Sequence, residues 1–289
     1  MQPILQLKNV TKAYKDFTLD EVSFDLPPGI VLGMIGENGA GKSTTISAIL
    51  DMIGLTEGSI KVFGMDHKKD GPAVREKIGT VIDGMNQIPY FYIKDVEKIY
   101  KNAYKNWDSE KFYTLLKRFK LPQDKQIKTF SKGMNVKLNF AAALSHNPDL
   151  LLLDEATSGL DPVMRNEILE TLQDYMAEGE RSILLSTHIT SDLDKIADYI
   201  LFIHEGKVRF LKSKEEIEEN YGILTCGEET LKALTPEDYD AYIKNAFSFR
   251  VLISNKKELT DHIKGLNIER ASVEDIMLFY IKGVLPCED

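Results

Sequence analysis

The chain has 289 residues, of which 43% are hydrophobic and 28% charged. These proportions are typical of a folded globular protein and exclude collagen-like, disordered and disulfide-scaffold classes. The net charge of -9 argues against a protein whose main task is to coat the phosphates of a nucleic acid. We therefore expect no nucleic acid partner.

Hydropathy and cysteine content indicate where the protein works. No apolar run approaches the roughly 20 residues that a membrane helix needs. The first residues, Met1–Gln6, do not combine a basic segment with a long apolar one, as a signal peptide would. The two cysteines, Cys226 and Cys287, lack zinc-type spacing. We expect a cytosolic protein with free thiols.

The N-terminal part begins with strand-like alternation of apolar residues from Ile4 to Leu26, which predicts paired strands at one edge of the fold. After a Pro-Pro-Gly turn, Ile30–Ile35 is apolar on both faces, as expected of a central strand in a helix-covered sheet. A glycine-rich turn follows, and Ser43–Met52 has near-helical apolar spacing. This order predicts a strand, a glycine loop and a helix as one unit.

The remaining chain alternates short apolar runs with helical segments. The predicted strands are residues 59–63, 78–82, 149–154, 182–187, 199–204 and 207–211. Residues 93–146 are rich in Lys, Glu and Leu and predict a helical insertion, and Pro162–Glu178 predicts a later helix. We expect an α/β domain over residues 1–220, with a mostly parallel sheet and an antiparallel edge, and a small α+β appendage over 221–289.

The glycine-rich turn fits the P-loop pattern Gly-x4-Gly-Lys-[Ser/Thr], between a buried strand and a helix as that motif requires. Glycines let backbone N–H groups approach phosphate oxygens closely, and the helix adds its positive end. Lys42 would bring charge to the phosphates and Ser43 a hydroxyl to Mg²⁺, whereas the alternative is an ordinary glycine turn. The nucleotide-binding residues predicted for this P-loop NTPase fold are Gly36, Glu37, Asn38, Gly39, Ala40, Gly41, Lys42, Ser43 and Thr44.

A second motif is the apolar strand Leu150–Leu153, which ends in two acids, Asp154 and Glu155. In a parallel sheet, ligand sites lie at the carboxyl ends of the strands, so both acids are expected beside the P-loop. Asp154 would then complete a Mg²⁺ site, and Glu155 would polarise the attacking water. The alternative is that these acids only cap the next helix.

The segment Phe130–Asn135 precedes the two acids and opens a predicted helix. It resembles the signature motif of ABC-type ATPases, whose usual form is Leu-Ser-Gly-Gly-Gln, and Ser131 and Gly133 match that form. After the acids, Ser158–Asp161 resembles the D-loop of the same family. The order and separation of these motifs agree with the family throughout.

Two single residues extend the resemblance, which covers about residues 4–220. His188, after a predicted strand, is similar to the family's switch histidine, and Tyr14 matches the position where these proteins stack an aromatic ring on adenine. A lone histidine is more often structural, but the carboxyl-end rule places His188 near the γ-phosphate.

The resemblance implies two ATPase subunits that face each other head to tail, so that each P-loop site is completed by the signature of the other subunit. Ser131 and Gly133 would reach the nucleotide across this interface, and Asp161 is also expected to bind nucleotide. ATP and Mg²⁺ are the implied ligands, and the partner subunit is either identical or related. The catalytic residues implied are Lys42, Glu155 and His188.

Two departures from the family pattern concern the metal site and the subgroup. Asp83 stands where most relatives carry Gln after a strand, and it is expected near Mg²⁺, which would then be bound by Ser43, Asp154 and Asp83. Ala156 replaces a common Pro. The acid at position 83 and the degenerate signature are similar to ATP-binding subunits of the bacitracin-resistance type of exporter.

An aromatic run, Tyr90–Tyr92, leads into the helical insertion. In the family this region borders the groove that receives a short helix of the membrane partner, so these rings either line that groove or belong to the core of the insertion.

Taken with the resemblance, the sequence indicates the ATP-binding subunit of an ABC transporter, which hydrolyses ATP and drives a membrane permease carried by a separate chain. The resemblance to the exporter subgroup implies that transport is export. It would lie on the cytoplasmic face of the membrane. The alternatives are a soluble ABC ATPase acting on nucleic acid or the ribosome, and a regulator that binds nucleotide without hydrolysis.

Overall fold

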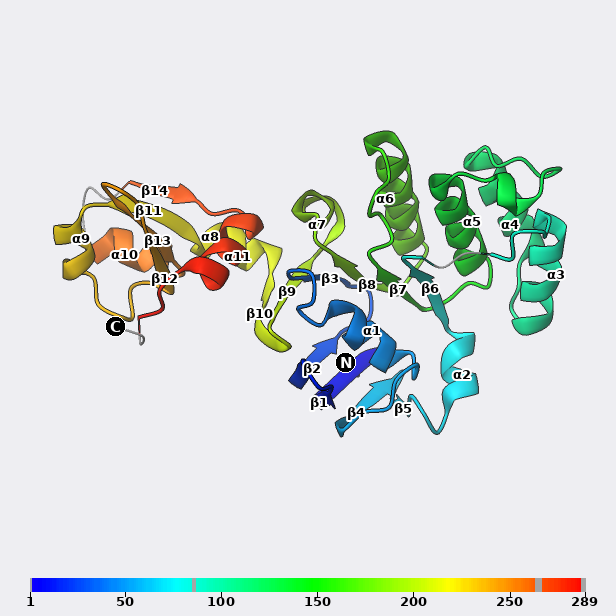
Figure 1. The fold of residues 1–289 in the computed structure, drawn as a ribbon, viewed down its shortest axis with the longest axis horizontal. Coiled ribbons are helices and arrows are strands. Elements are labelled where there is room, and N and C mark those ends of the chain that lie inside the picture. The colour runs from blue at the N-terminus through cyan, green and yellow to red at the C-terminus, as the bar shows by residue number, and fades with distance from the viewer. Residues whose placement is uncertain (1, 85–86, 263–266, 287–289) are drawn as a thin grey trace. The chain divides into compact units, whose positions relative to one another are not determined.

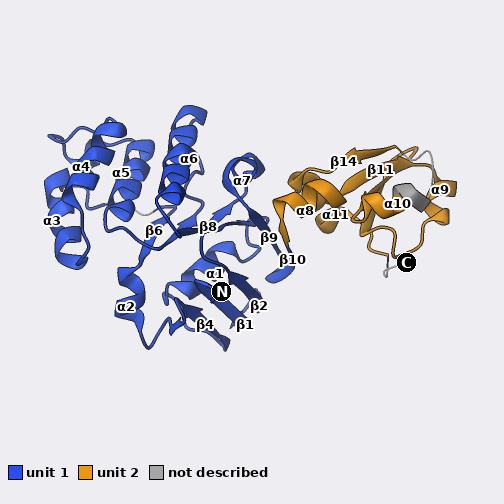
Figure 2. Cartoon of the chain, turned by 180° about the vertical axis from the view of Figure 1, so that it is seen from behind, with its two compact units in different colours: residues 1–211 blue, residues 212–289 orange. Residues whose placement is uncertain are grey.

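The computed structural model describes residues 2–84, 87–262 and 267–286, which excludes Cys287. The chain divides into two compact units, Met1–Leu211 and Lys212–Asp289, which are described separately (Figure 2). The sequence placed this division after Asn220. The two boundaries differ because α8 (Lys214–Asn220) contacts α10 (Lys256–His262) and therefore belongs to the second unit.

The first unit begins with an antiparallel sheet in the strand order β2-β1-β4-β5. Its strands are β1 (Leu5–Ala13), β2 (Thr18–Leu26), β4 (Glu57–Val62) and β5 (Met65–Asp66). Leu5, Leu7 and Val10 of β1 alternate with more exposed residues and are buried, as the sequence pattern requires. The antiparallel edge is thereby confirmed.

The second sheet of this unit has the strand order β10-β9-β3-β8-β7-β6. Its strands are β3 (Val31–Ile35), β6 (Ile78–Ile82), β7 (Leu150–Asp154), β8 (Ser182–Thr187), β9 (Tyr199–His204) and β10 (Lys207–Ser213). The pairs from β9 to β6 are all parallel, and β3, β7 and β8 are buried along their whole length. The predicted α/β class with a mostly parallel sheet is confirmed.

Helices cover both faces of the parallel sheet, with α6 and α7 on one face and α1 on the other (Figure 1). Outside the helical insertion, the helices of this unit are α1 (Lys42–Ile49), α2 (Gly71–Glu76), α6 (Pro162–Ala177) and α7 (Thr190–Ile196). Ile46 and Ile49 of α1 belong to one buried core with Met34 of β3 and Leu152 of β7. This packing fixes the start of α1 against the sheet, next to the carboxyl end of β3.

A helical segment is inserted between β6 and β7. It consists of α3 (Ile93–Ala103), α4 (Ser109–Arg118), a 3₁₀ turn (Ile127–Thr129) and α5 (Lys132–Leu144). Tyr90, in the loop that leads into this segment, is 71% exposed, whereas Phe91 and Tyr92 are partly buried. The exposure of Tyr90 agrees with a surface position, and the partial burial of Phe91 and Tyr92 agrees better with packing inside the insertion.

The second unit is built around a four-stranded antiparallel sheet in the order β12-β13-β11-β14. After α8 it contains β11 (Gly222–Cys226), α9 (Glu228–Ala233), β12 (Ala241–Lys244), β13 (Phe249–Ile253), α10, β14 (Ile268–Arg270) and α11 (Val273–Lys282). From β11 to β14 this is the βαββαβ arrangement of ferredoxin-like folds. No helix among the residues described is both long and apolar enough to cross a membrane.

His146 joins the end of the helical insertion to the parallel sheet. Its ring is buried and stacks on Tyr104 at a centroid distance of 3.9 Å, and its Nε2 lies 3.1 Å from the carbonyl oxygen of Ile78 in β6. A carbonyl oxygen only accepts, so Nε2 carries the hydrogen. Burial lowers the pKa of the His146 imidazole below its ordinary value.

We predict that His146→Gln reduces the acid sensitivity of the fold. Since the pKa is lowered in the folded state, the unfolded chain binds the extra proton as pH falls below about 6.5, and the free energy of unfolding decreases by up to about 1.4 kcal/mol per pH unit. Urea unfolding of both proteins at pH 7.5 and pH 5.5 measures this effect. The packing loss common to both pH values cancels in the comparison, and an equal fall in both proteins would contradict the assignment.

Candidate functional site

The glycine-rich loop between β3 and α1 forms the floor of the site. Gly39 and Gly41 have φ values of 85° and 114°, in the left-handed region that favours glycine. A Cβ on Gly36 would lie 2.2 Å from the carbonyl oxygen of Ile203, and a Cβ on Gly41 would lie 2.9 Å from Cδ1 of Leu19. Gly36 and Gly41 therefore allow the loop to pack closely against its neighbours, whereas Gly39 allows the left-handed turn of the backbone.

Lys42, the first residue of α1, is only 5% exposed. Its ammonium donates hydrogen bonds to the carbonyl oxygens of Gly36 (2.7 Å) and Glu37 (3.2 Å) and lies 3.4 Å from Oε1 of Glu155. A buried ammonium is costly unless it is paired and hydrogen-bonded, and here it is both. The loop thus holds one positive charge in a fixed place.

A cavity of about 480 Å³ opens above this loop. Asp16, Phe17 and Glu155 line it together with Ser43, Thr44 and other residues of the loop. Tyr14 is outside this lining; its ring is 47% exposed, and the ammonium of Lys12 lies 5.2 Å from the ring centroid. Phe17 was not singled out from the sequence, where it reads only as one more apolar residue of an edge strand.

Asp154 ends β7 and is 6% exposed. Its Oδ1 accepts hydrogen bonds from the hydroxyls of Ser43 (3.1 Å) and Ser186 (2.5 Å). A carboxylate and a hydroxyl held together at a phosphate-binding loop are oxygen donors of the kind that Mg²⁺ takes, with phosphate and water completing its shell. The residues present therefore fit the predicted metal. Ser186 was missed, although the parallel register pairs it directly with Asp154.

Glu155 follows in the left-handed region, with φ 49°. Its N–H donates to the carbonyl oxygen (3.1 Å) and to Oγ (3.2 Å) of Ser186, which holds the residue at the sheet edge. Oε2 lies 2.6 Å from Nδ1 of His188, whereas the buried Oε1 has no hydrogen-bond partner in the described part of the chain, only the 3.4 Å ion pair with Lys42. An acceptor atom of this carboxylate is thus left unsatisfied at the cavity wall.

The signature and D-loop residues lie at the starts of two other helices. Ser131 caps α5 by accepting a hydrogen bond from the N–H of Met134 (3.2 Å), and Asp161 caps α6 by accepting from the N–H groups of Val163 and Met164 (both 3.0 Å). A Cβ on Gly133 would lie 2.4 Å from Sδ of Met164, so the two helix starts are packed together. None of Ser131, Gly133 and Asp161 is among the residues lining the P-loop cavity.

Asp83 is attached to the site through its backbone, because its N–H donates to the carbonyl oxygen of Asp154 (2.9 Å). Its side chain turns to another partner: Oδ1 lies 3.2 Å from Nζ of Lys132. Of the three residues predicted to bind the metal, Ser43 and Asp154 are thus joined by a hydrogen bond, whereas the carboxylate of Asp83 forms an ion pair with Lys132.

A buried pair behind Glu155 was also missed. The Thr157 hydroxyl donates to Oδ2 of Asp192 (2.7 Å), and Asp192 is only 1% exposed. This bond ties the segment after Glu155 to α7, the helix that follows His188. Residues 35 positions apart give no sequence signal of such a contact.

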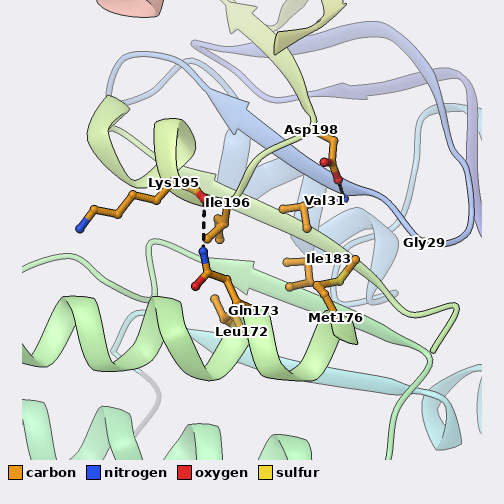
Figure 3. A pocket seen from close by; sticks show the side chains of 9 residues that line it. All are labelled: Gly29, Val31, Leu172, Gln173, Met176, Ile183, Lys195, Ile196 and Asp198. Atoms are coloured by element: carbon orange, nitrogen blue, oxygen red, sulfur yellow. Dashed lines mark hydrogen bonds between the residues drawn. The ribbon is translucent and has the colours of Figure 1, made fainter. Parts of the chain in front are cut away.

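A second cavity, of about 330 Å³, lies at the amino ends of β3 and β8, away from the P-loop (Figure 3). Leu172, Gln173 and Met176 of α6 form one wall, and Gln173 donates to the carbonyl oxygen of Lys195 (3.4 Å). Asp198 closes the other end by accepting from the N–H of Val31 (2.8 Å). None of the residues predicted to bind nucleotide or metal lines this cavity.

Comparisons with known proteins agree with this geometry. The family model described as ABC transporter matches residues 19–158. A bacitracin transport ATP-binding protein of Enterococcus faecalis is 31% identical over 71% of this chain and 68% of that protein. A lantibiotic transport ATP-binding protein of Streptococcus pyogenes is 34% identical over 75% of this chain and 95% of that protein.

Solved structures show the same fold. An ATP-binding subunit of an ABC transporter superimposes with a TM-score of 0.68 at 26% identity, over 74% of this chain and 92% of that one. An ATP-binding cassette in a dimeric post-hydrolysis state with ADP and phosphate gives a TM-score of 0.63 at 25% identity, over 72% and 98%. From its motifs, its P-loop site and these relatives, the chain belongs to the ATP-binding subunits of ABC transporters, a family of ATPases.

Proposed function

We propose that this chain hydrolyses ATP at an interface with a second ATPase subunit and thereby drives export through a membrane permease on a separate chain. The observation that carries the proposal is the position of Glu155. Its carboxylate lies between Lys42 of the P-loop and His188, at the wall of the cavity, with one buried oxygen unsatisfied. A carboxylate so placed can accept a proton from water beside a bound phosphate.

The P-loop from Gly36 to Thr44 would hold the phosphates of ATP, with backbone amides and the Lys42 ammonium as donors. Ser43 and Asp154 would hold Mg²⁺, which neutralises phosphate charge when bound. Tyr14, with Phe17 at the cavity wall, would provide the apolar surface for adenine.

In hydrolysis, Glu155 orients the attacking water and takes its proton. The Nδ1–H of His188 donates to Oε2 of Glu155 at 2.6 Å and keeps that carboxylate turned toward the phosphates. Only a ring that carries hydrogen on both nitrogens can also donate from Nε2 to the γ-phosphate. Lys42 stabilises the negative charge that develops on the phosphate oxygens. Ser186 supports both acids, because it donates to Asp154 and accepts from the N–H of Glu155.

A facing subunit would complete the site. Ser131 and Gly133 stand at the start of α5 and Asp161 at the start of α6, outside the cavity of their own chain, and helix starts attract phosphate. Head-to-tail pairing of two identical or related subunits would bring these residues to a nucleotide bound on the opposite P-loop.

The transport role rests on the relatives, whose names describe ATP-binding proteins for bacitracin and lantibiotic transport. Subunits of this kind work with a membrane partner, so we place this chain on the cytoplasmic face of the membrane. The exposed ring of Tyr90, beside the partly buried Phe91 and Tyr92, is a candidate surface for that partner.

We expect Glu155→Gln to abolish turnover while ATP binding persists, because the amide keeps the shape of the side chain but cannot take a proton. Loss of at least a hundredfold in the rate of phosphate release is expected, together with a stable dimer in the presence of ATP and Mg²⁺. Phosphate release and light scattering measure the two effects. Undiminished hydrolysis would remove Glu155 from this role.

Ser186→Ala should lower the ATPase rate about tenfold, because it removes the bonds that orient both acids. The matched control is Ser182→Ala, at the other end of β8, where the buried hydroxyl also makes two hydrogen bonds, accepting from Gly29 and donating to Pro27. Both variants should lose about 1 kcal/mol of stability. Equal ATPase rates in the two variants would show that the effect is only structural.

Export through a permease predicts that the native protein, extracted from its source membranes in mild detergent, is recovered with an integral membrane protein. Mass spectrometry of the purified complex identifies the companion. Recovery with ribosomes or nucleic acid, and without any membrane protein, would contradict the transport role and favour a soluble ABC ATPase.

A further inference from the structure

Lys132 stands at an electrostatically unfavourable place. It is the first residue of α5, and the first turn of this helix carries no acidic residue. The N-terminus of a helix bears partial positive charge, so a lysine there is repelled and an anion is attracted. A negative partner for a cation at this position is therefore favourable.

In the described structure that partner is Asp83, whose Oδ1 lies 3.2 Å from Nζ of Lys132. Both side chains are about half exposed, with exposed fractions of 58% for Lys132 and 49% for Asp83. A Cβ on Gly159, which has a φ of 71°, would lie 3.3 Å from the same Nζ. The ammonium thus lies against the D-loop and faces solvent, beside Ser131 and Gly133.

Gln87 is joined to the helical insertion without the ion pair. Nε2 of Gln87 donates to Oδ1 of Asn139 in α5 (2.9 Å) and to the hydroxyl of Tyr100 in α3 (3.2 Å), and Asn139 is 3% exposed. These partly buried hydrogen bonds join Gln87 to α3 and α5, whereas an exposed ion pair contributes little stability. The bond between Asp83 and Lys132 can therefore be exchanged without loss of the fold.

We propose that Lys132 is a phosphate-binding residue of the composite site and that Asp83 holds it in reserve. In the free subunit Asp83 neutralises the ammonium; when two subunits pair, Lys132 leaves Asp83 and contacts the triphosphate bound to the P-loop of the facing subunit. A lysine supplies a mobile point charge for phosphate, and its flexible stem allows the exchange. This inference rests on the head-to-tail pairing proposed above.

The test uses the full chain in the Glu155→Gln background, where ATP and Mg²⁺ should hold the dimer. Lys132→Gln is expected to raise the dimer dissociation constant by about tenfold or more, since charged contacts to both nucleotides are lost. Asp83→Asn is expected to lower it, because Lys132 is released from its intramolecular partner. Lys101→Gln, an equal charge change at an exposed lysine in the last turn of α3, is the matched control and should leave the dimer unchanged.

The opposite signs expected for Lys132→Gln and Asp83→Asn separate phosphate binding from a structural ion pair. Equal weakening of the dimer by both changes, or no effect of Lys132→Gln, would overturn the proposal. Lys132→Arg, which keeps the charge, should restore most of the dimer if Lys132→Gln also lowers the melting temperature. If the Glu155→Gln parent itself does not dimerise with ATP and Mg²⁺, the head-to-tail function fails before Lys132 is tested.

Discussion

The site depends on two opposite charges that the fold holds at one edge of a buried sheet. Lys42 starts α1, after the loop that follows β3, and Glu155 directly follows β7. Strand β8 lies between β3 and β7 in the sheet, and the charged atoms of Lys42 and Glu155 lie 3.4 Å apart. Removing these charges from water is unfavourable, and the carbonyl oxygens of Gly36 and Glu37 offset part of that cost for the lysine. Glu155 is less well satisfied, which leaves it available for chemistry.

The intervening strand β8 explains how this arrangement is kept. Ser186 is paired in register with Asp154, so its hydroxyl reaches the aspartate while its backbone and hydroxyl accept the N–H of Glu155. Glu155 adopts a left-handed conformation that a non-glycine residue takes only at a cost, and these bonds contribute to holding it there. The same strand then delivers His188 to the second oxygen of Glu155. One register therefore orders both acids and the histidine.

Much of this site can be predicted from the sequence because its main parts are short motifs whose place on strand ends follows from the parallel sheet. The P-loop, Asp154, Glu155 and His188 are of this kind. Ser186 as a support and the bond between Thr157 and Asp192 depend on contacts between distant elements, which no local pattern reveals. The unit boundary after Leu211 was not predicted for a related reason: the sequence of a short helix such as α8 does not show which unit the helix packs against.

The distribution of hydrogen-bond donors also bears on the proposed pairing of two subunits. Within one chain, the P-loop site contains Lys42, the candidate metal ligand Asp154 and the candidate base Glu155. The starts of α5 and α6, where helix N–H groups attract anions, contribute no residue to the lining of that cavity. The hydroxyl of Ser131 and the carboxylate of Asp161 already satisfy amides at these starts, so the isolated subunit is stable without a ligand there. A triphosphate presented by a second subunit would add charge-assisted contacts to a surface that needs no refolding, and binding energy of that kind is gained only in the closed pair. In the proposed pair, closure would depend on the γ-phosphate and would be lost when hydrolysis removes it, which is the differential affinity that a two-state motor requires.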